Sequence, residues 1–266
     1  MINGLYTSAS GMNAEMIRQD VVTNNLANIS TVGFKKDEAI FTSFPNMMVH
    51  RINDRLAPGA ASFLLPQASS QPLGVVGHGV QTHSTVVKFS DGSVTKTENP
   101  LDMAIQGNGL FAVELKDGST AYTRAGNFVQ NEAGQLSTQD GNVVLGINGA
   151  PINIDGGTVV VDTTGRVLVN GADAGTLKLE AWDPSRMTKW GEGLYGKSEA
   201  DIEVTAESPN APDAKVVQGY LEESNSKVIE GMVDMITVTR AYDANQKAIQ
   251  IQDSTLDKVI NEVGKV

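Results

Sequence analysis

The sequence lacks cysteine entirely, and it contains only three histidines, His50, His78 and His83. Without cysteine the chain forms no disulfide, no thiol nucleophile and no cysteine-based zinc or iron–sulfur site. His78 and His83 are five residues apart in an expected strand, so their side chains would point to opposite faces, which is poor geometry for one metal ion. We therefore expect no metal site and no cofactor.

Positive charge is also scarce, because 20 Lys and Arg residues stand against 31 Asp and Glu residues. The resulting net charge of -11 repels phosphate backbones and anionic lipid head groups. We expect no nucleic-acid partner and no direct lipid binding. No apolar run approaches the roughly 18 residues of a membrane span, and residues 1–25 lack the pattern of a cleavable signal peptide. Composition leaves two locations open, the cytoplasm and export with an uncleaved N-terminus.

Catalytic motifs are equally scarce. The run Gln106-Gly107-Asn108-Gly109 lacks the Lys-Ser/Thr ending of a phosphate-binding loop, and no serine has a nucleophile-elbow context. Paired carboxylates such as Glu98 with Asp102, or Glu222 with Glu223, would suit glycoside hydrolysis, but acidic residues are abundant throughout. We expect the chain not to be an enzyme. The alternative is a secreted β-domain enzyme that acts on cell-wall polysaccharide.

Both ends of the chain carry side chains at alternating spacings of three and four residues, which is the seam pattern of a coiled coil. We expect the helical ends, residues 1–30 and 223–266, to pair with each other. The first 30 residues carry only three charges, at Glu15, Arg18 and Asp20, which suggests contacts on every side, neighbouring copies included. The expected assembly seam consists of Leu5, Ala9, Met12, Met16, Leu26, Val228, Met232, Met235, Tyr242, Ile249 and Leu256.

The middle of the chain is rich in turn signals. Asp-Gly and Asn-Gly pairs recur between residues 91 and 171, and they supply the positive φ angles of tight hairpins. Strand-like runs flank them, for example Gly109–Lys116 with Ser119–Arg124. We predict an antiparallel β domain over residues 73–222 and a partly irregular, proline-containing connector over residues 31–72. The fold class is α+β, with an antiparallel all-β central domain inserted between N- and C-terminal helices that pair as a coiled coil.

Residues 4–36, GLYTSASGMNAEMIRQDVVTNNLANISTVGFKK, resemble the N-terminal signature of the bacterial flagellar basal-body rod and hook proteins. The residues that carry the signature are Asn25, Leu26, Asn28, Gly33 and Phe34. Asparagines can bond to the backbone where the helix ends, and a glycine permits a sharp exit that the phenylalanine then anchors. The C-terminal residues 219–263 and the run NPLDMAIQGNGLFAVE also resemble this axial protein family. The likeness is strongest to a proximal rod protein of the FlgF/FlgG type, with a distal rod or hook-type subunit as the alternative.

This resemblance implies a structural subunit of the flagellar basal-body rod that polymerises axially through its terminal helices and serves motility. Its partners would be other copies of itself, neighbouring flagellar axial proteins and the flagellar type III export apparatus. The implied location is the basal body, reached by export without signal cleavage.

Overall fold

A computed structural model describes residues 2–45, 47–50, 72–181, 183, 187–191, 193–197 and 214–263. The chain divides into two compact units, and each is described by itself. Unit 1 comprises residues 1–20, 39–85 and 235–266, and unit 2 comprises residues 21–38 and 86–234. The β domain predicted from the sequence begins at residue 73, whereas residues 73–85 belong to unit 1.

Each end of the chain forms a long helix that contributes to both units. Helix α1 spans Ile2–Ala27, and helix α2 spans Val228–Lys258 and continues as a π-helical turn, η2, over Val259–Val263. None of the helices among the described residues has both the length and the apolarity needed to cross a membrane.

The two helices are in contact within unit 1. A Cβ atom placed on Gly4 would lie 2.6 Å from Nε2 of Gln252, and one on Gly11 would lie 3.0 Å from Nδ2 of Asn245. Because the partner moves backwards along α2 as the chain advances along α1, the helices run antiparallel in this unit. Within unit 2, Leu26 Cδ1 lies 3.5 Å from the corresponding Cβ position of Gly231. These contacts are compatible with a coiled coil, although its regular seam packing stays a prediction.

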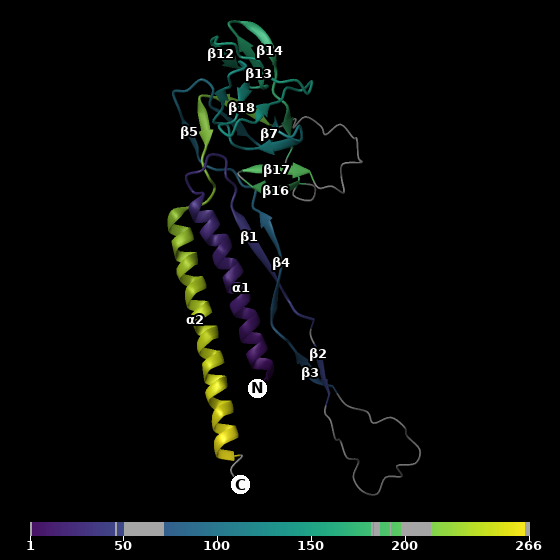
Figure 1. Cartoon of the computed structure of the whole chain (residues 1–266), viewed down its shortest axis with the longest axis vertical. Helices are drawn as coiled ribbons and strands as arrows, with labels where there is room; N and C mark the ends of the chain where they lie inside the picture. The colour runs from purple at the N-terminus through teal and green to yellow at the C-terminus, as the bar shows by residue number, and fades with distance from the viewer. Residues whose placement is uncertain are drawn as a thin grey trace, which may run out of the picture. The chain divides into compact units, whose positions relative to one another are not determined.

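Besides the helices, unit 1 contains strands that form two short ribbons (Figure 1). Strands β1 and β4 pair with each other, and β2 pairs antiparallel with β3. Two of these strands lie in the stretch for which the sequence predicted an irregular connector. The bounds are β1 (Asp37–Ser43), β2 (Met47–His50), β3 (Pro72–Val76) and β4 (Val80–Val87).

Unit 2 is built around an eight-stranded sheet with the order β16-β17-β8-β7-β11-β10-β9, in which β15 also pairs with β7. A three-stranded sheet, β12-β13-β14, and two pairs, β18-β6 and β19-β5, complete it (Figure 1). Neighbouring strands in these sheets run antiparallel. The bounds are β5 (Val94–Lys96), β6 (Met103–Gln106), β7 (Leu110–Glu114), β8 (Thr120–Thr123), β9 (Val129–Gln130), β10 (Leu136–Ser137), β11 (Val143–Val144), β12 (Val159–Val161), β13 (Arg166–Val169), β14 (Ala172–Thr176), β15 (Leu179–Glu180), β16 (Met187–Gly191), β17 (Leu194–Lys197), β18 (Lys215–Gln218) and β19 (Tyr220–Glu222).

Strand β7 divides the core of unit 2 into two layers. Successive side chains of a strand point to opposite faces of the sheet. Phe111 and Val113 therefore enter the larger cluster, where the Phe111 and Phe128 rings meet edge to face at 5.0 Å. Leu110 and Ala112 enter a smaller cluster on the other face. Since both faces are covered, this strand reads as a continuous apolar run.

The turn signals of the sequence give hairpins in most places. In five of the seven Asp-Gly and Asn-Gly pairs between residues 91 and 171 the glycine has a positive φ angle, including Gly118 between β7 and β8. Gly92 and Gly109 are the exceptions, and the Gly92 N–H donates to the Glu222 carboxylate. The α+β class with an antiparallel β region between terminal helices is thus confirmed.

Candidate functional site

The predicted assembly seam is partly covered in the single chain. Leu5, Met12 and Leu26 on α1 are half-buried, as are Met235, Tyr242, Ile249 and Leu256 on α2. Ala9, Met16, Val228 and Met232 are exposed. The four half-buried seam residues of α2 recur every seven positions. The role of the seam in assembly stays a prediction.

The face of α1 that meets α2 includes two glycines, Gly4 and Gly11, which the predicted seam does not contain. Gly4 and Gly11 leave room for Gln252 and Asn245, while Ser8 and Ala14 are buried. A glycine inside a helix costs about 1 kcal/mol relative to alanine. A glycine inside a helix therefore usually has a packing reason. Gly4 and Gly11 were the sequence feature from which close packing against α1 could have been predicted.

An apolar stripe begins in the first turn of α2. Ile229, Met232, Val233 and Ile236 follow the spacing i, i+3, i+4, i+7, which places them on one helix face. Their exposed fractions are 78%, 53%, 56% and 53%. Beside Ile229, a groove of about 840 Å³ runs between this turn and the segment after α1, where Ile29 and Val32 line it. We call these four residues the α2 stripe.

The segments that follow α1 and precede α2 meet at a buried carboxylate in unit 2. Glu222 Oε1 accepts hydrogen bonds from Lys35 Nζ at 2.5 Å and from the Gly92 N–H at 2.8 Å, and its Oε2 accepts from Arg124 Nε at 2.5 Å. The side chains of all three charged residues are at most 1% exposed. The Phe89 ring lies 4.9 Å from Lys35 Nζ and 5.6 Å from Arg124 Cζ.

The rest of the Arg124 and Lys35 bonding is to main-chain carbonyls. Arg124 donates to the carbonyls of Ile105, Gly107 and Gly109, and Lys35 Nζ donates to the Ser90 carbonyl at 2.7 Å. Every charge here therefore has partners. Removing one member of such a buried ionic group is unfavourable, because it leaves uncompensated charge among buried side chains.

Electrostatics favour the ionised form of Glu222. Burial alone would raise the pKa of this carboxyl group. The charge of Arg124 and the hydrogen bonds from Lys35 and the Gly92 N–H outweigh burial, and they hold the pKa of Glu222 below its usual value. The pKa of Lys35 is lowered, because burial penalises its charged form more than Glu222 favours it.

Asn225 bridges the same segments with its side-chain amide. Its Oδ1 accepts from the Lys36 N–H at 2.7 Å, and its Nδ2 donates to the carbonyl of Lys88 at 2.8 Å and to Ser90 Oγ at 3.0 Å. We call residues 33–36, 88–92 and 222–225 the terminal junction. It ties the exit of α1 to the entry of α2 within unit 2.

The family-signature residues lie at or beside this junction. Gly33 has a φ angle of 68°, and its N–H donates to the Glu222 carbonyl at 2.8 Å. Phe34 is buried, with Lys189 Nζ 4.3 Å from its ring. The Asn25 side chain exchanges two hydrogen bonds of 2.8 Å with the main chain of Asp37.

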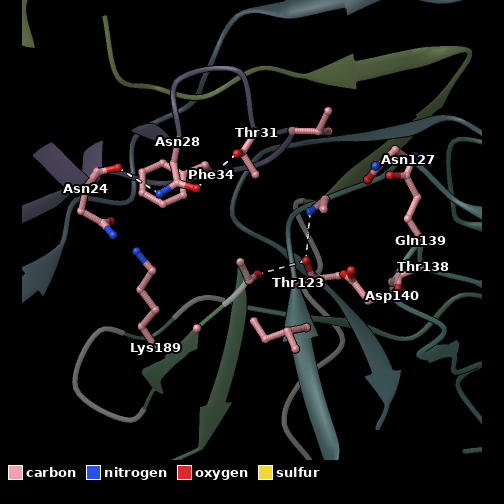
Figure 2. Close-up of a pocket in the computed structure, with 15 residues that line it drawn as sticks. Asn24, Asn28, Thr31, Phe34, Thr123, Asn127, Thr138, Gln139, Asp140 and Lys189 are labelled. Carbon is pink, nitrogen blue, oxygen red and sulfur yellow. Dashed lines mark hydrogen bonds between the residues drawn. The ribbon is translucent and has the colours of Figure 1, made fainter. Parts of the chain in front are cut away.

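A cavity of about 360 Å³ lies beside Phe34. Figure 2 shows Asn24 and Asn28 on one side, Gln139 and Asp140 on the other, and Lys189 reaching toward the Phe34 side. Seven of the fifteen lining residues carry an amide or hydroxyl side chain. Lys189 is held by Asp37 at 2.8 Å, so its charge is already compensated.

Three of the four carboxylates considered for glycoside hydrolysis make hydrogen bonds within the chain. Glu222 is held by its cations, and Glu223 accepts from the Thr95 hydroxyl at 2.8 Å. Asp102 accepts from the side-chain amide of Asn99 at 2.9 Å. His78 Nδ1 lies 3.2 Å from the Val76 carbonyl, and the side chain of His50 lies outside the described residues. Among the described residues, no cluster of three His, Asp or Glu side chains could hold a metal ion.

Three family models match successive parts of the chain. Residues 5–35 match the flagella basal body rod protein, residues 104–169 match the flagellar hook protein FlgE/F/G D1 domain, and residues 217–262 match the flagellar basal body rod FlgEFG protein C-terminal region. The first match covers the signature residues, and the first and third together cover residues 33–35 and 222–225 of the terminal junction. The second match covers most of the larger apolar cluster of unit 2.

Curated relatives match over nearly the full length. The chain is 34% identical to the flagellar basal-body rod protein FlgG of Buchnera aphidicola subsp. Baizongia pistaciae, over 97% of this chain and 99% of that protein. It is 33% identical to FlgG of Caulobacter vibrioides, over 96% of this chain and 97% of that protein. It is 31% identical to the flagellar hook-basal body complex protein FlhO of Bacillus subtilis, over 100% of both. The chain therefore belongs to the flagellar basal-body rod protein family and is of the FlgG type.

Proposed function

We propose that this chain polymerises axially through its terminal helices, with other copies of itself and neighbouring flagellar axial proteins as its partners. Membership of the family makes it a structural subunit of the flagellar basal-body rod rather than an enzyme, and places it in the basal body. Its export by the flagellar type III apparatus, without signal cleavage, is part of the same proposal.

The α2 stripe is the observation that carries this proposal. Four large apolar side chains on one helix face are more than half exposed in the single chain. Contiguous exposed apolar surface of this kind marks interaction sites. The groove beside Ile229 extends the same surface toward Ile29 and Val32. A helix of a neighbouring copy would cover the stripe without any change in the chain itself.

Helix α1 supports the proposal through its lack of charge. Its charges are confined to Glu15, Arg18 and Asp20, and its first turn contains no acidic residue. Tyr6 and Met16 are nevertheless 65% and 51% exposed. A helix that faces water permanently usually carries more charged residues. Burial of α1 between neighbouring copies accounts for both features.

Replacement of Met232 tests the proposal. Met232→Lys should leave the unfolding free energy of the isolated chain within about 0.5 kcal/mol of the unsubstituted value, because the side chain is exposed there. In the rod the charge would be buried without a partner, at a cost of several kcal/mol. We therefore expect cells whose own rod gene is replaced by this variant to lack complete rods and motility.

Met232→Leu is the matched control, since it keeps an apolar side chain of similar volume. We expect complete basal bodies with this variant, by electron microscopy of isolated basal bodies. Normal rods and motility with Met232→Lys would refute assembly through the α2 stripe. A large loss of stability in the isolated Met232→Lys chain would place the residue in an internal core instead.

A further inference from the structure

The terminal junction joins parts of the chain that are far apart in sequence. Lys35 and Glu222 are separated by 187 positions, yet they form a buried ion pair. Five main-chain N–H groups donate across the junction, and each reports on whether it is closed. They are Gly33 to the Glu222 carbonyl, Lys36 to Asn225 Oδ1, Lys88 to the Lys36 carbonyl, Gly92 to Glu222 Oε1, and Asn225 to the Phe34 carbonyl.

The buried charges make the two terminal segments depend on each other. Lys35 and Arg124 are both cations with fully buried side chains, and the buried Glu222 carboxylate bonds to both. Asp91 approaches Arg124 to 3.7 Å, but its side chain is 74% exposed. If residues 222–225 were absent, docking of residues 33–36 would bring a second unpaired cation beside Phe89. Burial of unpaired charge is strongly unfavourable, so residues 33–36 dock only onto a chain whose C-terminal segment is already in place.

The larger apolar cluster of unit 2 does not use the junction, whereas Phe89 of the junction packs against the smaller cluster. The N–H groups of Ala112, Leu136 and Leu145 donate to the carbonyls of Lys178, Ile152 and Ala112, all within residues 112–178. The larger apolar cluster likewise runs from Leu101 to Val216 and contains no residue of the junction. These three hydrogen bonds and the packing of the larger cluster therefore do not depend on the junction.

We propose that Glu222 is a positioning residue that makes the terminal junction a latch. With the Glu222 carboxylate in place, residues 33–36 and 222–225 are held together and set the exit of α1 beside the entry of α2. With the latch open, both terminal segments are released while the β core stays folded. The role of the latch rests on the rod function proposed above, since a subunit that assembles through both terminal helices needs both helices held in position together.

Hydrogen exchange of the full chain, resolved by amide NMR, tests the latch. In Glu222→Gln the amide nitrogen replaces one oxygen, so Lys35 and Arg124 lose their carboxylate. We expect the five junction amides to exchange about a hundredfold faster or more, whereas the amides of Ala112, Leu136 and Leu145 change by less than about threefold.

Two further variants separate the charge from general disturbance. Glu223→Gln removes a neighbouring, exposed carboxylate that accepts from the Thr95 hydroxyl, so exchange at the junction should stay within about twofold of the unsubstituted chain. Lys35→Met combined with Glu222→Gln removes one of the two cations that Glu222→Gln leaves without a carboxylate. The junction amides should therefore exchange more slowly than in Glu222→Gln alone.

Equal acceleration of junction and core amides in Glu222→Gln, or a chain that fails to fold, would overturn the latch, because Glu222 would then belong to the common core. Unchanged junction exchange would overturn it as well. Asn225→Ala leaves no charge without a partner. It should therefore speed exchange of the same five amides to a smaller extent and leave exchange of the core amides unchanged. Because none of these measurements involves a rod, the latch and the proposed function can fail separately.

Discussion

Gly33 occupies a position that only glycine suits. Its φ angle of 68° lies in the left-handed region, and a Cβ atom there would lie 2.5 Å from the main-chain nitrogen of Ala125. The strain and the clash are separate effects, because one comes from the residue's own backbone and the other from a rigid neighbour. The N-terminal signature therefore contains glycine at this position for two physical reasons.

Replacement of this glycine separates the two effects. Gly33→Ala should lower the unfolding free energy of the chain by about 2–4 kcal/mol, since main-chain atoms must move. Gly118→Ala is the control, because Gly118 has a φ angle of 83° but open space around its Cβ position, so a loss of about 1 kcal/mol is expected. Urea denaturation measures both. Equal losses would mean that the Ala125 contact adds nothing.

The lowered pKa of Glu222 predicts a pH dependence with a defined sign. A carboxyl group whose pKa is lower in the folded chain contributes stability above its unfolded pKa, near 4.5, and loses it as the pH falls through the folded value. The difference in unfolding free energy between the unsubstituted chain and Glu222→Gln should therefore be constant from about pH 5 to 8. Below pH 4.5 it should shrink. Urea denaturation across this range measures it, and a difference independent of pH would contradict the assignment.

Sequence reasoning found one half of the terminal junction. Gly33 and Phe34 carry a local signature, but Glu222 appeared only as one of many acidic residues, and Asn225 gave no signal. The partners of Lys35 lie 55 and 187 positions away. Contacts at such separations leave no periodic pattern in a single sequence, so tertiary structure alone brings them together.

Among the elements, the terminal helices were predictable because their three-four spacing extends over many turns. Met235, Tyr242, Ile249 and Leu256 lie on the covered side of α2, as the heptad pattern implies. The covered side of α1 was less visible, since Gly4, Ser8 and Gly11 contribute space rather than apolar volume. Strand β1 was also missed, because it alternates between half-buried and exposed residues without a strong apolar face.

A disulfide test distinguishes the helix register of unit 1. Gly11→Cys with Asn245→Cys should cross-link under mild oxidation, because a Cβ atom on Gly11 would lie 3.3 Å from Cγ of Asn245. Met12→Cys with Met235→Cys is the control pair. Position 235 lies ten residues before Asn245, which is about 15 Å along the helix. Non-reducing electrophoresis and mass spectrometry of the monomer detect the bond, and preferential linkage of the control pair would contradict the antiparallel register.

For the whole molecule, the prediction of an α+β chain from the rod family is confirmed. Two different sequence features made that prediction possible. The β region was recognisable from its closely spaced turn pairs, such as Asp117-Gly118 between β7 and β8. The family was recognisable from motifs at both ends and in the centre. The proximal position along the rod stays a prediction, because no residue of the sequence identifies which axial proteins lie next to this subunit.

The absence of cysteine allows the central claim, that the α2 stripe is buried between subunits of the rod, to be measured directly. Met232→Cys introduces a single thiol at a position that is 53% exposed in the chain, and Val160→Cys introduces one at a position that is 50% exposed in the β region. Maleimide labelling rates are compared between the purified monomer and isolated rods. We predict that assembly slows labelling at position 232 at least about tenfold more than at position 160, as expected for a thiol packed between helices. Equal labelling of position 232 in monomer and rod would contradict assembly through the terminal helices.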